Sequence, residues 1–353
     1  TVNTVADQNV CAETAVTLPF SGFVAGTVFE WTNSNTAIGL AASGTGNLSY
    51  TATNTTSSPI TATIIVTPKY TNAGVTCTGN PISFTITVNP TPTVAAVTNQ
   101  VLCNGAATTA VAFTGATTGT VYNWTNSNTS IGLAASGTGD IASFTAVNTG
   151  ATAATATITV TPTYTGAGFT CTGTATTFTI TVNPTPSLTA VSNSIICNGS
   201  SNAITLTGPV TGSVYSWTND NTAIGLAASG TGNISFTATN PGPDPITGTV
   251  SVTPSYTNAG LTCTGTASTF TVTVNPSGQV NTVSNQVLCN GSTTSAVTFS
   301  TTNNGLISTG GTQTASSGTI SVSVPDASAA GATHTIPVNL PTCAVINNIL
   351  FFF

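Results

Sequence analysis

The 353-residue sequence is almost without charge. It contains one lysine, no arginine, one histidine and seven acidic residues. Charged residues make up 2% of the chain, against about a quarter in an ordinary soluble protein. With a formal net charge of −6, the chain cannot neutralise a nucleic acid backbone or hold an anionic lipid surface. The composition therefore excludes nucleic acid and peripheral membrane partners.

Methionine and long apolar runs are also missing. The most apolar stretch, the tail at 349–353, is far too short to cross a bilayer, so we expect no membrane insertion. Thr1 aligns with Thr93, which follows a repeat boundary. We therefore expect the chain to be a mature or excised piece of a longer product.

The sequence does contain one domain-sized unit that occurs three times. The string I-G-L-A-A-S-G-T-G stands at 38–46, 131–139 and 224–232. The tryptophans that precede it, Trp31, Trp124 and Trp217, are spaced 93 residues apart. A period of this length is one small domain. The predicted domains are repeat 1 (1–92), repeat 2 (93–186), repeat 3 (187–278) and a shorter, divergent C-terminal β-domain (279–353).

Repeat 2 shows the strand pattern most clearly. Apolar residues alternate with threonine over 154–162 and again over 177–182, which predicts strands with one face in a core and one in water. Tyr122 and Trp124 share a parity and should both point inward. Further short strands are expected at 101–103, 110–113 and 141–147, and no helical period occurs. The predicted fold class is all-β, a tandem array of immunoglobulin-like β-sandwich domains.

The eight cysteines fall two per repeat. One disulfide inside each domain is the simplest interpretation, and it implies an oxidising compartment outside the cytoplasm. The predicted pairs are Cys11 with Cys77, Cys103 with Cys171, Cys197 with Cys263, and Cys289 with Cys343. Zinc is the competing interpretation, but the sequence has no C-x-x-C and a single histidine, His334.

Proline-rich segments join the repeats at 89–92, 183–186 and 275–278. Two prolines in four residues hold the chain extended and restrict swivelling, so the first two joints should be semi-rigid. In the third joint Gly278 replaces a proline, and we expect a bend there.

These motifs together carry a family resemblance. The chain has C-N-G near the start of three units, V-Y-x-W-T-N, S-I-G-L-A-A-S-G-T-G, T-C-T-G and F-T-I-T-V-N-P-T-P. Over about residues 1 to 278 it resembles the PKD-like repeats of very large surface proteins in the Bacteroidetes, including adhesins of the gliding-motility kind. The resemblance implies a cell-surface location and an adhesive or fibrous role, with no catalytic residues. Repeat 1 departs from it by having Cys11-Ala12-Glu13 in place of C-N-G.

Candidate chemistry is sparse. With His334 as the only histidine, the three repeats cannot hold a Ser-His-Asp site. The seven acidic residues are scattered, and no segment offers the close carboxylate pair of a glycosidase or the clustered carboxylates of a calcium site. We therefore expect no enzyme activity, no cofactor and no metal.

The sequence favours an extracellular rod or fibre segment of a bacterial surface adhesin, which could assemble head-to-tail into filaments. The alternative is a glycan- or cell-surface-binding array that uses the repeated I-G-L-A-A-S-G-T-G loops, and an enzyme accessory region is a third class. The tail is the candidate self-assembly segment, or it closes its own sandwich as a final strand. Its residues are Ile349, Leu350, Phe351, Phe352 and Phe353.

Overall fold

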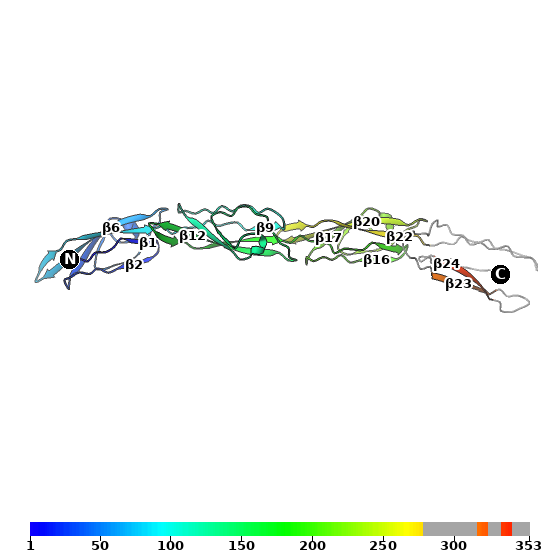
Figure 1. Ribbon diagram of the computed structural model, residues 1–353, viewed down its shortest axis with the longest axis horizontal. Helices are drawn as coiled ribbons and strands as arrows, with labels where there is room; N and C mark the ends of the chain where they lie inside the picture. Colours follow the sequence, from blue (N-terminus) through cyan, green and yellow to red (C-terminus); the bar gives the residue numbers. More distant parts are fainter. Residues whose placement is uncertain (278–315, 324–332, 341–353) are drawn as a thin grey trace, which may run out of the picture. The chain divides into compact units, whose positions relative to one another are not determined.

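The computed structural model describes residues 1–277, 316–323 and 333–340 (Figure 1). The chain divides into two compact units, Thr1–Pro184 and Thr185–Phe353. The first unit holds repeats 1 and 2. The described part of the second holds repeat 3 and an antiparallel hairpin of β23 (Ser316–Ser323) and β24 (Thr333–Leu340).

Repeat 1 is built from two sheets. Its strands are β1 (Gln8–Cys11), β2 (Ala15–Leu18), β3 (Val28–Asn33), β4 (Ser43–Thr45), β5 (Leu48–Thr51), β6 (Ile60–Asn72), β7 (Val75–Thr78) and β8 (Ile82–Asn89). The larger sheet has the order β1-β8-β6-β3-β4, and β7 pairs with the far end of β6. The smaller sheet is the β2-β5 pair. The predicted all-β sandwich class is confirmed.

Repeats 2 and 3 have the same order in their larger sheets. Repeat 2 has β9 (Gln100–Cys103), β10 (Val121–Asn126), β11 (Ser136–Thr138), β12 (Ala154–Gly166), β13 (Phe169–Thr172) and β14 (Thr176–Asn183). Repeat 3 has β15 (Ser194–Cys197), β16 (Ser201–Ile204), β17 (Val214–Asn219), β18 (Ser229–Thr231), β19 (Ile234–Thr237), β20 (Ile246–Asn258), β21 (Leu261–Thr264) and β22 (Ser268–Asn275).

The smaller sheet is interrupted in repeat 2. The strands predicted at 110–113 and 141–147 are reduced there to two isolated bridges, Ala107 with Thr145 and Val111 with Ile141. The hydroxyl of Thr108 accepts a hydrogen bond from the backbone amide of Phe144 at 3.0 Å, so a side chain occupies part of the backbone ladder.

The long strand of each repeat changes neighbours at a proline. In repeat 2, β12 pairs with β14 as far as Val160 and with β13 from Thr163 onward. Pro162 lies between these two ladders, where its missing N–H is not needed, and its carbonyl accepts from Gly173 N at 2.9 Å. The strand therefore runs to Gly166, beyond the end at Pro162 that the sequence predicted.

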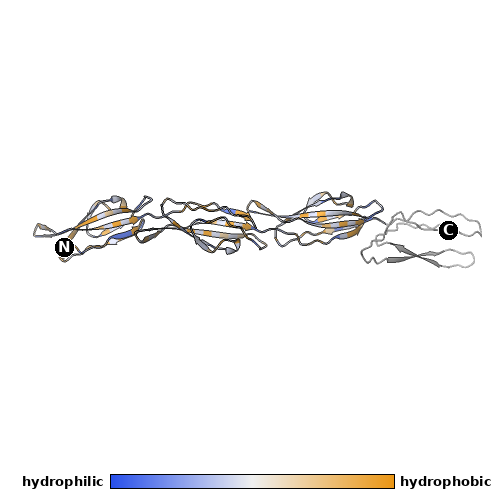
Figure 2. Cartoon of the chain, turned by 45° about the horizontal axis from the view of Figure 1, so that its top comes forward, coloured by the Kyte–Doolittle hydropathy of each residue, from blue (hydrophilic) through white to orange (hydrophobic). Residues whose placement is uncertain are grey.

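Each repeat has its own hydrophobic core, and Figure 2 shows the apolar residues that line its strands. The inward faces predicted for repeat 2 are confirmed: Ala156, Ile158 and Val160 are at most 1% exposed. Trp124 is buried and Tyr122 is half-buried. On the outer face, the hydroxyls of Thr155 and Thr181 are hydrogen-bonded across the strands at 3.0 Å.

Candidate functional site: the joint between repeats 1 and 2

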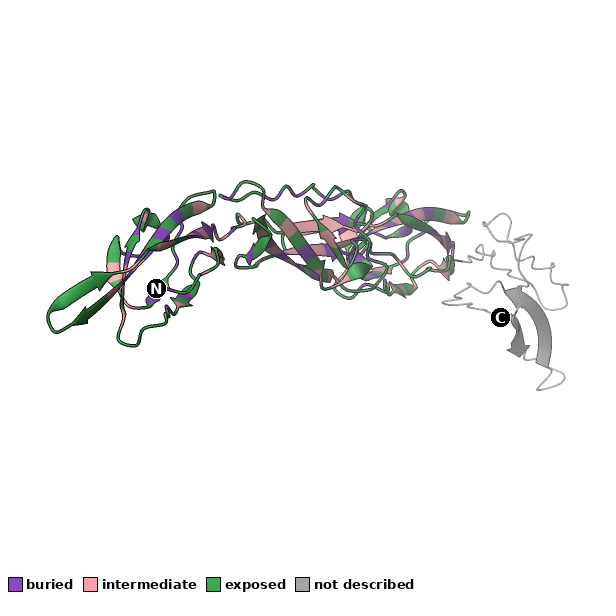
Figure 3. Cartoon of the chain, turned by 60° about the vertical axis from the view of Figure 1, so that its left-hand side comes forward, coloured by how far each residue is buried: buried purple, intermediate pink, exposed green. Residues whose placement is uncertain are grey.

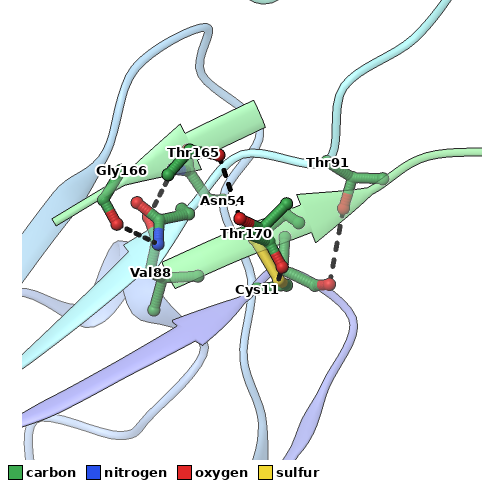
Figure 4. Close-up of a disulfide and its surroundings, with 10 residues drawn as sticks. Cys11, Asn54, Val88, Thr91, Thr165, Gly166 and Thr170 are labelled. Carbon is green, nitrogen blue, oxygen red and sulfur yellow. Dashed lines mark hydrogen bonds between the residues drawn. A yellow bond between two sulfur atoms is a disulfide. The ribbon is translucent and has the colours of Figure 1, made fainter. Parts of the chain in front are cut away.

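A disulfide joins repeat 1 to repeat 2. Cys11, at the end of β1, is bonded to Cys171 in β13, with the Cα atoms 5.6 Å apart and a sequence separation of 160. Figure 4 shows this bond beside Thr170 of β13 and Thr91 of the linker. Cys171 is 1% exposed. The joint is therefore a covalent staple between neighbouring repeats.

The predicted pairs inside repeats 1 and 2 are wrong. Cys11 lies opposite Asn89, at the end of the sheet where β6 begins, whereas Cys77 lies opposite Tyr70 near the end of β6. At about 3.3 Å per residue these two ends are roughly 30 Å apart, far beyond the 7 Å limit between Cα atoms of a disulfide. Cys103 and Cys171 are separated in the same way along β12.

Repeat 3 repeats this geometry. Cys197 lies opposite Asn275 at one end of its sheet, and Cys263 lies opposite Tyr256 near the other. The predicted Cys197–Cys263 pair is therefore also wrong, although both cysteines, like Cys103, are disulfide-bonded. Among the described residues Cys77 is the free cysteine, and it is exposed. Cys289 and Cys343 lie outside the described residues.

The hairpin formed by β12 and β13 packs its tip on repeat 1. Asn89 Nδ2 donates to Gly166 O, and Asn9 Nδ2 donates to Ala167 O, each at 3.5 Å. Asn89 is fully buried, and a Cβ at Gly166 would lie 2.5 Å from its Oδ1. The close approach of the hairpin therefore requires glycine at position 166.

The linker at 89–92 is packed between the two repeats. Pro90 and Pro92 are buried, and Thr91 Oγ1 donates to Ala12 O at 3.4 Å. A Cβ at Gly173 would lie 1.8 Å from the carbonyl oxygen of Pro92, so β13 is also followed by a tight contact with the linker. These contacts add to the restriction that the prolines impose on their own.

A cleft beside this linker is lined mostly by small polar residues. Its walls include Ala12, Glu13, Thr53, Thr91, Thr174 and Thr176. Glu13 is the one ionisable residue among those that line the cleft, so the cleft offers no acid–base pair. Across the part of the chain that the structure describes, no three His, Cys, Asp or Glu residues gather closely enough to hold a metal ion.

The repeated I-G-L-A-A-S-G-T-G loop is part of the core. In repeat 1, Ile38 is fully buried, Leu40 is 4% exposed, and Asn33 Nδ2 donates to Leu40 O at 2.8 Å. Gly39 takes a left-handed conformation with φ of 89° and caps the 3-10 turn Thr36–Ile38. Packing accounts for the apolar residues and this glycine.

A second glycine in the loop makes room for the tryptophan. A Cβ on Gly44 would lie 2.2 Å from Cζ2 of Trp31, and the counterparts Gly137 and Gly230 approach Trp124 and Trp217 at 2.3 Å. The indole nitrogens of all three tryptophans are buried without a hydrogen-bond partner. The repetition of the loop is thus explained by packing in each sandwich.

Two candidates from the sequence remain, His334 and the tail at 349–353. His334 lies in β24 opposite Val322. The candidate self-assembly tail at 349–353 lies outside the described residues. Within those residues, no helix is long and apolar enough to span a membrane.

The fold is thus a series of immunoglobulin-like sandwiches, with a disulfide between the first two. A PKD-like domain model matches the chain twice, at residues 8–92 and 194–278. These two stretches, in repeats 1 and 3, are similar to PKD-like domains, and repeat 2 shares their strand order. No curated protein sequence matches the chain.

Several solved structures resemble the chain at low identity. Sidekick-1 immunoglobulin domains 1-5 match at 14% identity and a TM-score of 0.32, over 80% of this chain and 61% of that one. Mouse cadherin-23 EC22-24 matches at 12% and 0.32, over 78% and 96%. Mouse protocadherin-24 EC1-3 matches at 12% and 0.30, over 77% and 98%. The chain thus spans less than two thirds of the Sidekick-1 chain.

Proposed function

We propose that this chain is an extracellular structural segment, a rod or fibre section of a bacterial surface adhesin, whose repeats are stapled together to bear tension. The Cys11–Cys171 bond carries the proposal, because it links two folded repeats and not two strands of one repeat. Disulfides persist in oxidising surroundings, which supports a secreted or surface location.

The bond changes the path that tension takes through the chain. A pull on the two ends enters repeat 1 at its N-terminus, reaches Cys11, crosses the disulfide and leaves through β13. The residues between Cys11 and Cys171 lie outside this path. The staple therefore spares the strands from β2 to β12, whereas β1 and β14 remain in the loaded path.

The glycan-binding alternative has weaker support. Ile38, Leu40 and Gly44 serve the core and the tryptophan of their own sandwich, so the identity of the three loops does not require a ligand. The residues of this loop that remain exposed, Gly39, Ala41, Ala42, Ser43 and Thr45, are small and uncharged. They offer a sugar little to bind beyond two hydroxyls.

Single-molecule stretching of the full chain, held at its two ends, tests the tension path. Breaking the bond can release at most the 160-residue span between the two cysteines, which at about 3.4 Å per residue is roughly 54 nm of extra length. A thiol reductant would also break the bonds of Cys103, Cys197 and Cys263, so the comparison is made without reductant.

The matched variant is Cys11→Ser with Cys171→Ser, which lacks this bond alone and should extend further than the native chain under the same force. Equal extension of the native chain and the variant would contradict the proposal. Filaments in electron micrographs of purified protein would support the fibre role. Glycan-array binding that is lost on changing the loop at 131–139 would favour the alternative.

A further inference from the structure

The turn that follows the first strand differs between repeat 1 and the other two repeats. Repeats 2 and 3 have C-N-G at this turn, whereas repeat 1 has C-A-E at 11–13. The third residue has a positive φ in every case: 71° at Glu13, 84° at Gly105 and 82° at Gly199. Glycine takes this left-handed conformation freely, but a residue with a side chain is strained in it. Repeat 1 therefore holds a glutamate in a conformation suited to glycine.

The second residue of the turn also differs in the hydrogen bond that it makes. In repeat 2, Asn104 Oδ1 accepts from the backbone amide of Asn148 at 2.8 Å, and repeat 3 has the equivalent bond at 2.9 Å. In repeat 1 the second residue is Ala12, which has no side-chain acceptor. The corresponding amide, that of Asn54, has no hydrogen-bond partner among the described residues. The C-A-E turn thus leaves one backbone donor unpaired.

The carboxylate of Glu13 is unpaired as well. In residues 1–184, all of which the structure describes, each of the other three acidic side chains has a partner. Asp7 and Asp140 accept from backbone amides, and Glu30 is paired with Lys69 at 2.6 Å. The chain has no arginine and no second lysine. A lysine-like or arginine-like partner for Glu13 would therefore have to come from another molecule.

Both unpaired groups belong to residues that line the cleft beside the linker. The cleft has a volume of about 520 Å³, within the range of small-molecule sites. Pro92 and Val94 contribute apolar wall. Hydroxyl groups come from threonines of both repeats, namely Thr53, Thr55, Thr91, Thr93, Thr174 and Thr176. A carboxylate, a free N–H and several hydroxyls thus surround one space.

Exposure alone does not make such a site. Strand β7 is exposed at every residue, as the green hairpin near the N-terminus in Figure 3 shows, but it has no carboxylate. The cleft differs because its polar groups face a shared volume that a ligand can fill.

The groups in the cleft define the chemistry of its ligand. A carboxylate forms charge-assisted hydrogen bonds with an ammonium group. Threonine hydroxyls and a backbone N–H suit the hydroxyls of a sugar, and Pro92 and Val94 suit the C–H face of its ring. Glu13 and the net charge of −6 disfavour an anion. An amino sugar with a free ammonium group combines the required features.

We propose that the cleft between repeats 1 and 2 binds an amino sugar, whose ammonium group pairs with Glu13 and whose hydroxyls contact the threonines. The strained φ of Glu13 then has a function, since it places a carboxylate at the cleft. This site goes beyond the proposed structural role and does not depend on it.

Isothermal titration calorimetry of the full chain with a disaccharide of glucosamine tests the site. The native chain should bind it, and the affinity should fall as sodium chloride is added, because the contact with Glu13 is ionic. The N-acetylated disaccharide lacks the positive charge, and propylamine has the charge without hydroxyls. Each should bind at least about tenfold more weakly.

Two single variants separate the charge of Glu13 from charge in general. Glu13→Gln keeps the size of the side chain and should weaken binding of the glucosamine disaccharide at least about tenfold. Asp140→Asn is the matched control, because its counterpart in repeat 1, Asn47, accepts from a backbone amide in the same way. Asp140→Asn should bind as the native chain does.

The double variant Ala12→Asn with Glu13→Gly rebuilds the C-N-G turn of the other repeats. It removes the carboxylate and supplies an acceptor for the amide of Asn54, so it should abolish binding. Its melting temperature should be no lower than that of the native chain, because glycine relieves the strain at position 13. Loss of binding would then not be a loss of fold.

Three results would overturn the proposal. The first is a native chain that does not bind the glucosamine disaccharide at millimolar concentration. The second is native-like binding by Glu13→Gln or by the double variant. The third is equal affinity for the glucosamine disaccharide and either of its two control ligands.

Discussion

The hairpins β6–β7 and β12–β13 have the same register and different surroundings. Both have a tyrosine opposite the cysteine and both turn through an Ala-Gly pair, at positions 73–74 and 167–168. Cys171 is buried under a neighbouring repeat and bonded to it, whereas Cys77 lies in solvent. The state of the two cysteines thus differs with their surroundings.

This difference shows that the hairpin cysteine serves the contact between repeats and is not needed for the core of its own sandwich. The core of repeat 1 is as complete as that of repeat 2, although its hairpin cysteine is not oxidised. A domain of this size can bury a core without a covalent bond. Variants that act differently on the two hairpins, or equally on the two cores, therefore test this conclusion.

The largest difference should come from removing the disulfide. The double variant Cys11→Ser with Cys171→Ser should lower the free energy of unfolding of the first unit by up to about 5 kcal/mol, because the bond closes a long loop. Cys77→Ser should change it by less than about 0.5 kcal/mol, as expected for an exposed position. Denaturant unfolding of both proteins measures this. If the double variant lost no more stability than Cys77→Ser, the disulfide would add no stability to the first unit.

The tryptophan contact should affect both repeats equally. Gly44→Ala in repeat 1 and Gly137→Ala in repeat 2 each place a methyl group within 2.3 Å of an indole carbon. Each should cost about 1–3 kcal/mol of stability by overpacking. Thermal unfolding with tryptophan fluorescence measures the loss. If only one of the two variants were destabilised, the two cores would not be equivalent.

The hairpin turns should respond to relief of backbone strain. Ala73 and Ala167 have φ of 48° and 47°, a left-handed conformation that alanine disfavours and asparagine tolerates. Ala73→Asn should stabilise repeat 1 by roughly 0.5–1 kcal/mol, since Asn-Gly is the preferred pair in such a turn. Chemical denaturation checks the gain.

Ala167→Asn is the matched variant in the joint. Its turn carries the same strain, but its carbonyl already accepts from Asn9 of repeat 1. We expect a gain no larger than that of Ala73→Asn. A larger gain in repeat 2 would contradict this expectation and would show that contact with repeat 1 stabilises the asparagine.

The strands and cores could be predicted from the sequence because alternation of apolar residues and threonine is a local signal. The inward positions Ile158 and Val160 followed from it directly. The end of β12 could not be predicted so well, because a proline within a strand is tolerated only where no neighbour needs its N–H, as at Pro162. Whether the N–H is needed depends on where β13 and β14 end along β12.

The disulfide pairing could not be predicted from a count of two cysteines per repeat. The useful signal was the position of each cysteine along the sheet: Cys11 lies beside Asn89, where the chain enters the next repeat, and Cys77 lies at the opposite end. Only the strand register reveals this separation, and connectivity of several cysteines is not fixed by spacing alone.

The smallest expected difference between the repeats is a pH dependence. Asp7 Oδ1 accepts a hydrogen bond from Thr85 N at 2.7 Å, and this bond to the backbone lowers the pKa of Asp7 below its usual value. The counterpart in repeat 2 is neutral: Asn99 Oδ1 accepts from Thr179 N at 2.7 Å. The two side chains make the same contact, but only one can be protonated in acid.

A carboxylate whose pKa is lower in the folded than in the unfolded state stabilises the fold above its unfolded pKa. That contribution is lost as the pH falls through the folded value, below about pH 4. Asp7→Asn should therefore melt at a lower temperature than the native chain near pH 7, and the difference should disappear or reverse near pH 2. Asn99→Asp is the reciprocal variant and should give repeat 2 the same acid sensitivity. Melting curves of the three proteins at both pH values measure the effect. A native-minus-Asp7→Asn difference that is constant with pH would show that the charge of Asp7 contributes nothing beyond the hydrogen bond that asparagine also makes.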